Sequence, residues 1–109
     1  MLKFITAKEA FNTNHGGSLM GYCSVPKETV ARLAAAQGVD ANDRNNYYDP
    51  DNGYDGWELN GFLNGVPFNI YTRYGTLKIG ANFDFCAALN DALRAAALEL
   101  DQTPTANAA

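Results

Sequence analysis

The segment from Trp57 to Ala81 constrains the fold of this chain more than any other part. Asn-Gly is the strongest short signal for a two-residue turn between antiparallel strands, and Asn64-Gly65 interrupts an otherwise strand-like run. Tyr74-Gly75 makes a second two-residue turn, because the strand-like residues on either side of it can be paired in the same way. The segment therefore predicts three consecutive antiparallel strands joined by two hairpin turns.

This register gathers the large apolar side chains on one face, because alternate residues of a strand point to opposite faces. The predicted pairs are Leu63 with Val66, Gly61 with Phe68, Leu59 with Ile70, Trp57 with Thr72, Thr72 with Leu77, Ile70 with Ile79, and Phe68 with Ala81. Glu58, Tyr71 and Lys78 then form one polar row on the outer face. A turn at Asn60-Gly61 would instead place Trp57 opposite Asn64, which is a poorer match.

Helical spacing of apolar residues predicts one helix before these strands and one after them. The first covers 27–37, with Ser24 as its N-cap and Gly38 as a left-handed C-terminal cap. The second is capped by Asn82 or Asp84 and runs to about Leu100. Both helices have an apolar stripe that must be buried against another element.

The expected architecture is a single α+β domain over residues 1–100. A short strand at 18–23 precedes the first helix, whereas residues 1–11 fit a strand or a helical turn equally well. The order β-α-β-β-β-α favours a two-layer sandwich, in which an antiparallel sheet of three or four strands carries both helices on one face. An uncovered sheet edge would allow a homodimer. Residues 101–109 are expected to form a disordered tail.

Composition and charge exclude several classes of function. The 109 residues carry 8 basic and 12 acidic side chains, so direct binding to nucleic acid or to an anionic membrane is not expected. No apolar run approaches the roughly 18–20 residues of a membrane span, and no basic segment leads into an apolar core at the N-terminus. We therefore expect a cytoplasmic protein without membrane association.

Three candidate chemistries have incomplete motifs, so we expect no enzyme, no catalytic residue, no metal and no cofactor. His15 and Ser18 flank two glycines, but the G-x-S-x-G turn of esterases is missing. Residues 49–55 open like a calcium loop and then lack its glycine and its final glutamate. Cys23 and Cys86 fit two buried free thiols better than a disulfide, a redox pair or a zinc site.

The segment 40–56 has no hydrophobic period and is long for a connection in so small a domain. Acids and tyrosines are interleaved in it, and tyrosine supplies contact area in protein interfaces at low entropic cost. We predict a partner-binding surface that faces a protein with a basic surface. Its residues are Tyr47, Tyr48, Asp49, Asp51, Tyr54 and Asp55. The alternative is that these aromatic rings fold back on the edge of the sheet.

The outer sheet face offers an alternative site, for a small ligand or a nucleotide that the protein would sequester. Tyr71, Arg73 and Lys78 share this face. Stacking and a charge-assisted hydrogen bond from such residues suit a nucleotide. A solvated sheet face without a ligand is the other interpretation.

Several short motifs resemble a group of small bacteriophage-encoded proteins of unknown function. They are the S-L-x-G-Y strand at 18–22, a helix that ends in glycine, a strand with Trp57, and the later pair Ile70-Tyr71. The resemblance spans about residues 17–81, and it ends where Thr72-Arg73 replaces the Trp-Lys pair of that group. It implies an accessory protein of a phage or mobile element. Such a protein would inhibit a host nucleic-acid-handling defence complex in the host cytoplasm, as anti-CRISPR proteins do.

Overall fold

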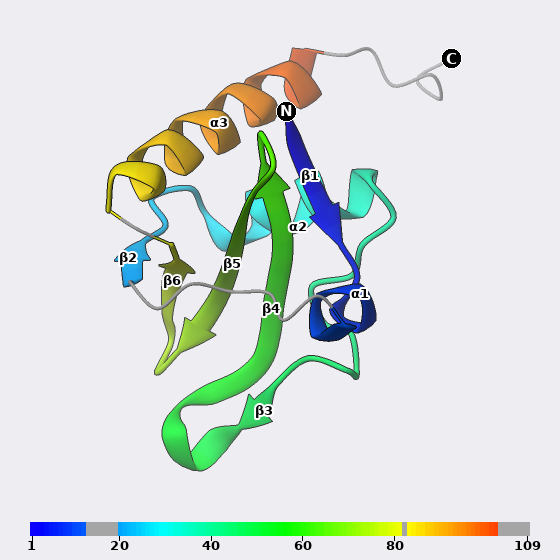
Figure 1. The fold of residues 1–109 in the computed structure, drawn as a ribbon, viewed down its shortest axis with the longest axis vertical. Coiled ribbons are helices and arrows are strands. Elements are labelled where there is room, and N and C mark those ends of the chain that lie inside the picture. The colour runs from blue at the N-terminus through cyan, green and yellow to red at the C-terminus, as the bar shows by residue number, and fades with distance from the viewer. Residues whose placement is uncertain (13–19, 82, 103–109) are drawn as a thin grey trace.

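The computed structural model describes residues 1–12, 20–81 and 83–102, which form an α+β fold (Figure 1). Its elements in chain order are β1 (Leu2–Ile5), α1 (Ala7–Asn12), β2 (Met20–Tyr22), α2 (Lys27–Ala36), β3 (Tyr48–Asp49), the 3-10 helix η1 (Pro50–Asn52), β4 (Tyr54–Leu63), β5 (Val66–Arg73), β6 (Thr76–Gly80) and α3 (Phe83–Gln102). All strand pairs are antiparallel, in the order β1-β4-β5-β6-β2, and β3 pairs with the start of β4.

The antiparallel α+β fold is confirmed, but the sheet has six strands rather than three or four. The ambiguous N-terminal residues supply both a strand, β1, and a short helix, α1. The segment 40–56 supplies β3, because it turns back on the start of β4 instead of remaining outside the sheet. Of the strand expected at 18–23, β2 is present, whereas Ser18 and Leu19 lie outside the described residues.

Both predicted hairpin turns are confirmed. Asn64 and Gly65 have φ values of 51° and 84°, and Tyr74 and Gly75 have 51° and 74°. Positive φ at both central residues is the mark of the type I′ turn, whose twist matches that of the flanking strands. A non-glycine residue rarely adopts this backbone, so Tyr74 is an unusual residue at this position.

The register is confirmed along most of the three strands, and two predicted pairs are absent from the ladders. Leu59 faces Ile70 and Ile70 faces Ile79, as expected. The pair of Trp57 with Thr72 is replaced by a bulge, because β4 has extra residues between the pairs Tyr54 with Arg73 and Glu58 with Tyr71. Gly56, with a φ of 86°, provides the bend. β6 ends at Gly80, so the expected pair of Phe68 with Ala81 is not part of the ladder.

The main core lies between the sheet and the two longer helices, α2 and α3. The sheet contributes Phe4, Leu59, Leu63, Phe68, Ile70 and Ile79, and the helices contribute Val30, Leu33, Ala34, Cys86, Leu89 and Leu93. The opposite face of the sheet is not simply solvated, because Ile5, Asn60 and Tyr71 are buried there. Helix α1 lies beside that second face and shares a cleft with it. The expectation of an open outer face is therefore corrected over this part of the sheet.

Three predictions concern the ends of the helices, and the one at Gly38 is confirmed. Gly38, with a φ of 80°, closes α2, and the amides of Gly38 and Val39 bond back to the last turn. Ser24 is not the N-cap of α2, because Pro26 holds that position and the Ser24 hydroxyl accepts instead from the Arg94 guanidinium of α3. Asp101 was expected in a disordered tail, but it lies in α3 and pairs with Arg32 at 2.8 Å; the rest of that expected tail, from residue 103 on, lies outside the described residues.

The free edge of β1 is occupied by the side chain of Gln37, the residue that caps the C-terminal end of α2. The Gln37 amide accepts from the Phe4 backbone N–H at 2.7 Å and donates to the Leu2 carbonyl at 3.1 Å. These two groups would otherwise be open to pairing with another strand. A homodimer through β1 would have to displace Gln37. Among the helices that the structure describes, none is long and apolar enough to cross a membrane.

Candidate functional site

The segment 40–56 is ordered around one buried side chain, Asn46. Its Nδ2 donates to the carbonyl of Ala41 at 2.7 Å, to that of Gly56 at 2.9 Å and to that of Glu58 at 3.3 Å. The Glu58 amide also donates to the Ala41 carbonyl at 3.0 Å. Buried backbone groups need such partners. Asn46 therefore fastens the segment to the part of β4 that neither β1 nor β3 pairs with.

The acidic side chains of this segment shape its turns as well as giving it charge. Asp49 accepts hydrogen bonds from the Asn52 amide at 2.7 Å and from the Tyr47 hydroxyl at 3.0 Å, which holds the pKa of Asp49 below its usual range. Burial raises the pKa of Asp55, but hydrogen bonds from Thr72 and from the Trp57 amide outweigh it and leave that pKa lowered. These carboxylates remain ionised at neutral pH.

The six predicted partner-binding residues lie together at one end of the molecule, where β3, η1 and the start of β4 meet (Figure 1). Tyr47 is 56% exposed and Tyr48 is 66% exposed. Tyr54 lies further in, with its ring 5.0 Å from that of Tyr47 and 5.9 Å from that of Tyr71. The predicted alternative, that the rings fold back on the sheet, describes Tyr54 but not its two exposed neighbours.

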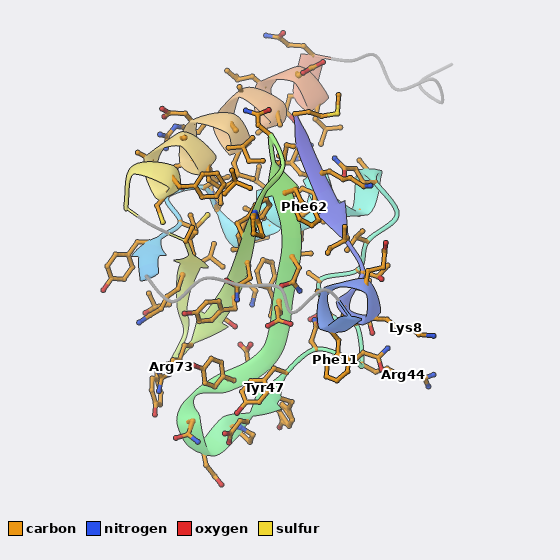
Figure 2. All side chains as sticks on the ribbon, in the orientation of Figure 1. Lys8, Phe11, Arg44, Tyr47, Phe62 and Arg73 are labelled. Carbon is orange, nitrogen blue, oxygen red and sulfur yellow. The ribbon has the colours of Figure 1, made fainter. Side chains whose placement is uncertain are left out.

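Two exposed aromatic residues in the same region were missed from the sequence. Tyr74, in the β5–β6 turn, is 70% exposed, and its backbone N–H donates to the Gly53 carbonyl at 2.9 Å. Phe11 in α1 is 86% exposed. Figure 2 shows Phe11 and Tyr47 on the same side of the molecule. No local pattern marks either residue, because only the docking of α1 and of the turn brings them here.

The alternative ligand residues Tyr71, Arg73 and Lys78 share the outer face, but each already has a neighbour. The Arg73 guanidinium lies 5.0 Å from the Tyr54 ring and 5.5 Å from the Tyr74 ring, and its Nε donates to the Asn52 carbonyl at 3.0 Å. Tyr71 is only 8% exposed. Lys78 lies over the ring of Tyr22. Their role as a ligand site stays a prediction.

An open cleft of about 730 Å³ lies between α1, the segment before β3 and the outer face of β4 and β5. Its lining includes the exposed rings of Phe11, Tyr47 and Tyr48, and the polar side chains of Glu58, Asn60 and Asn69. The Asn69 side chain lies against Gly80, and its buried Oδ1 has no hydrogen-bond partner in the described parts of the chain. The cleft therefore joins aromatic walls to a polar floor.

Glu58 is the charged group of this cleft and is half-buried. Burial raises the pKa of its carboxyl, although hydrogen bonds from the Asn60 side chain and the Tyr47 backbone N–H oppose the shift. Within the described residues, no lysine or arginine forms an ion pair with it. A carboxylate that is withdrawn from water without a counter-ion lowers the stability of the folded state.

The raised pKa of Glu58 predicts a pH dependence of stability. Because the folded state holds this proton more tightly than the unfolded state, the contribution of Glu58 is most favourable below about pH 4.3, the ordinary glutamate pKa. It is lost as the pH rises through the folded pKa. We expect Glu58→Gln to raise the free energy of unfolding at pH 7.5, and to raise it less at pH 5.

Urea denaturation at the two pH values measures this difference. Glu28→Gln is the matched control, because Glu28 is an exposed glutamate. It lies in the first turn of α2, where a negative charge favours the helix, so its neutralisation should lower stability by up to about 1 kcal/mol and should not raise it. A Glu58→Gln variant that is less stable than the wild type at pH 7.5 would contradict the account of Glu58 as an uncompensated carboxylate.

The other candidate chemistries of the sequence receive no support as sites. Cys23 and Cys86 are free thiols, and burial raises the pKa of each, which disfavours the reactive thiolate. In the ranges 1–12, 20–81 and 83–102 no three histidine, cysteine or acidic side chains are placed to hold a metal ion. His15 and Ser18 lie outside the described residues. Comparisons of the chain with protein-family models, curated proteins and solved structures found no match.

Proposed function

We propose that this protein is a non-catalytic protein-binding module. Its binding surface, here called the aromatic end, consists of Tyr47, Tyr48, Asp49, Asp51, Tyr54 and Asp55, with Tyr74 beside them. The partner is a protein or complex with a basic surface. The resemblance to small phage proteins adds the proposal that this partner belongs to a host nucleic-acid-handling defence complex, which the protein inhibits in the cytoplasm.

The observation that carries this proposal is the exposure of Tyr47 and Tyr48 on an ordered hairpin. Side chains that are already held in place lose little freedom on binding, so more of the contact energy appears as affinity. The Tyr47 hydroxyl is fixed by Asp49, and Asn46 fixes the backbone on which both rings stand. Exposed tyrosine on a rigid support is typical of the residues that dominate binding energy in protein interfaces.

The charge of the aromatic end supports a basic partner. Asp51 is exposed in η1, and Asp49 is kept ionised by its hydrogen-bond donors. The chain as a whole carries a net charge of −4. Such a surface speeds encounter with positive patches, and it does so less at high salt.

Affinity capture from bacterial lysate with the tagged protein, at about 50 and 300 mM salt where screening differs strongly, would identify the partner by mass spectrometry. The double variant Tyr47→Ala/Tyr48→Ala should then weaken binding of the purified partner by at least about 30-fold, because truncated tyrosines at interface centres typically cost about 2 kcal/mol or more. Asp51→Asn should reduce the salt dependence without removing any hydrogen bond described above.

Matched controls separate this surface from general effects of tyrosine or charge. Tyr22→Ala removes an equally exposed tyrosine from β2, at the opposite edge of the sheet, and should leave affinity within about threefold. Glu28→Gln removes one negative charge from α2. If the double variant binds the captured partner as tightly as Tyr22→Ala does, the aromatic end is not the binding surface.

The nucleotide-sequestering alternative through Tyr71, Arg73 and Lys78 has less support. The guanidinium of Arg73 is held between two tyrosine rings and a backbone carbonyl, so a phosphate would have to compete with these contacts. A thermal-shift screen with nucleotides tests it, since a bound ligand raises the melting temperature by mass action. Stabilisation that Arg73→Ala abolishes would favour this alternative.

A further inference from the structure

Glu58 lies in the cleft beside the aromatic end, and its carboxylate is oriented but not neutralised. The Asn60 side chain and the Tyr47 backbone N–H donate to it. None of the described lysines or arginines pairs with it. An incoming cation would therefore gain more at Glu58 than at an exposed carboxylate, because water screens this group less.

The walls of the same cleft suit a cation with an apolar or flat surface. Phe11, Tyr47 and Tyr48 all line it, and all three are exposed. Aromatic rings attract cations through their negative faces, and the attraction is stronger where water is partly excluded. The volume of about 730 Å³ lies within the range of ordinary ligand pockets.

A guanidinium fits these groups better than an ammonium ion does. It is planar, stacks on aromatic rings and sheds its water more easily than an ammonium. A carboxylate offers about four acceptor positions, and Asn60 and Tyr47 use two of those on Glu58. The remaining positions can accept the paired N–H groups of a guanidinium.

We infer that this cleft binds an arginine side chain of the partner protein, with Glu58 as the carboxylate and Phe11, Tyr47 and Tyr48 as the walls. The inference rests on the proposed function, and it specifies the chemistry of the partner. Lys8 and Arg44, the protein's own cations in this region, extend outward on the far side of Phe11 from Tyr47 (Figure 2). The arginine would enter beside Tyr47, next to the aromatic end.

The test is an NMR titration of the ¹⁵N-labelled full chain with a blocked arginine, N-acetyl-arginine methylamide. We expect binding on the order of millimolar, with shifts centred on Glu58, Asn60 and the Asn69 side-chain amide. The citrulline analogue has nearly the same shape without the charge and should produce no such shifts. Glu58→Gln should weaken binding at least about tenfold, because a charge-assisted pair becomes a neutral one.

A second variant, Phe11→Ala, tests the aromatic wall of the cleft without changing Glu58. Phe11→Ala removes an exposed ring, so the fold is retained, and it should weaken binding about threefold. The matched control Val66→Ala removes apolar atoms from another exposed position, the first residue of β5, and should have no effect.

Several outcomes would overturn the inference. Equal shifts with the arginine and citrulline compounds, equal affinity for a blocked lysine, or unchanged binding by Glu58→Gln would each exclude a guanidinium site. Micromolar binding of free agmatine, far tighter than that of blocked arginine, would make the ligand a free metabolite and not a partner side chain. If the probe fails while Tyr47→Ala/Tyr48→Ala still loses the captured partner, the cleft inference falls and the proposed function stands.

Discussion

Replacing Phe68 with alanine should lower the free energy of unfolding by about 3–5 kcal/mol, the usual cost of removing a buried aromatic side chain. Phe68 is fully buried in β5, and its ring meets that of Phe4 edge to face at 6.0 Å. It also lies against Gly61, where a Cβ would come within 2.7 Å of the Phe68 ring. The Phe68 ring is thus packed against β1 and β4 as well as its own strand, β5. These strands cannot shift to fill the cavity that alanine would leave without breaking the hydrogen bonds between them.

Urea denaturation followed by circular dichroism measures the change, with Phe11→Ala as the matched control. The control makes the same substitution at a side chain that is 86% exposed, so it should change stability by less than about 0.5 kcal/mol. Total stabilities of small domains are about 5–15 kcal/mol, so Phe68→Ala should leave a marginal fold. Equal midpoints for the two variants would mean that the core is not centred on Phe68.

Replacing Asn46 with alanine should lower the free energy of unfolding by about 2–3 kcal/mol, because it removes one hydrogen-bond donor from each of three backbone carbonyls that are buried or partly buried. Asn46 is only 9% exposed, and one amide nitrogen serves Ala41, Gly56 and Glu58. The loss falls on the segment that carries Tyr47 and Tyr48. We therefore expect this variant to weaken partner binding by loosening that segment, although Asn46 itself is almost fully buried.

Hydrogen exchange distinguishes a local effect from a global one. Amides of residues 41–58 should exchange faster in Asn46→Ala, whereas those of β5 and β6 should change less. Asn45→Ala is the control, because Asn45 is exposed and the hydrogen bond of its side chain within the described residues stays in its own turn, to Asp43. Uniform acceleration over the whole chain, or equal exchange in the two variants, would contradict the role of Asn46 as the local anchor.

Features that depend on near neighbours in the chain were predicted correctly. Asn64-Gly65 and Tyr74-Gly75 form the two turns, and counting outward from them gives the pairs Leu59 with Ile70 and Ile70 with Ile79. The count fails where Gly56 introduces a bulge, which shifts Trp57 out of line with Thr72. An Asp-Gly pair marks this point in the sequence and could have signalled the irregularity.

Features that depend on distant segments were not predicted. β1 needs Gly61 of β4 for close approach, since a Cβ there would meet the Lys3 carbonyl at 2.3 Å, but nothing near Leu2–Ile5 specifies that partner. Asn46 reads as one more polar residue of a loop, although it holds three carbonyls of the surrounding backbone. Glu58 was placed on the outer face, yet its burial required α1 to lie beside that face.

The sequence by itself determined the α+β class, the two hairpins, the two longer helices and the acidic, tyrosine-rich character of 40–56. These follow from turn chemistry, periodicity and charge, which act over a few residues. Only the tertiary structure decided that this segment is fastened by Asn46, that Phe11 and Tyr74 lie near its tyrosines, and that Glu58 lies in a cleft where the described residues supply no counter-ion. The burial of a side chain and its hydrogen-bond partners across the sheet depend on which distant segments pack together, and the local sequence pattern does not specify that packing.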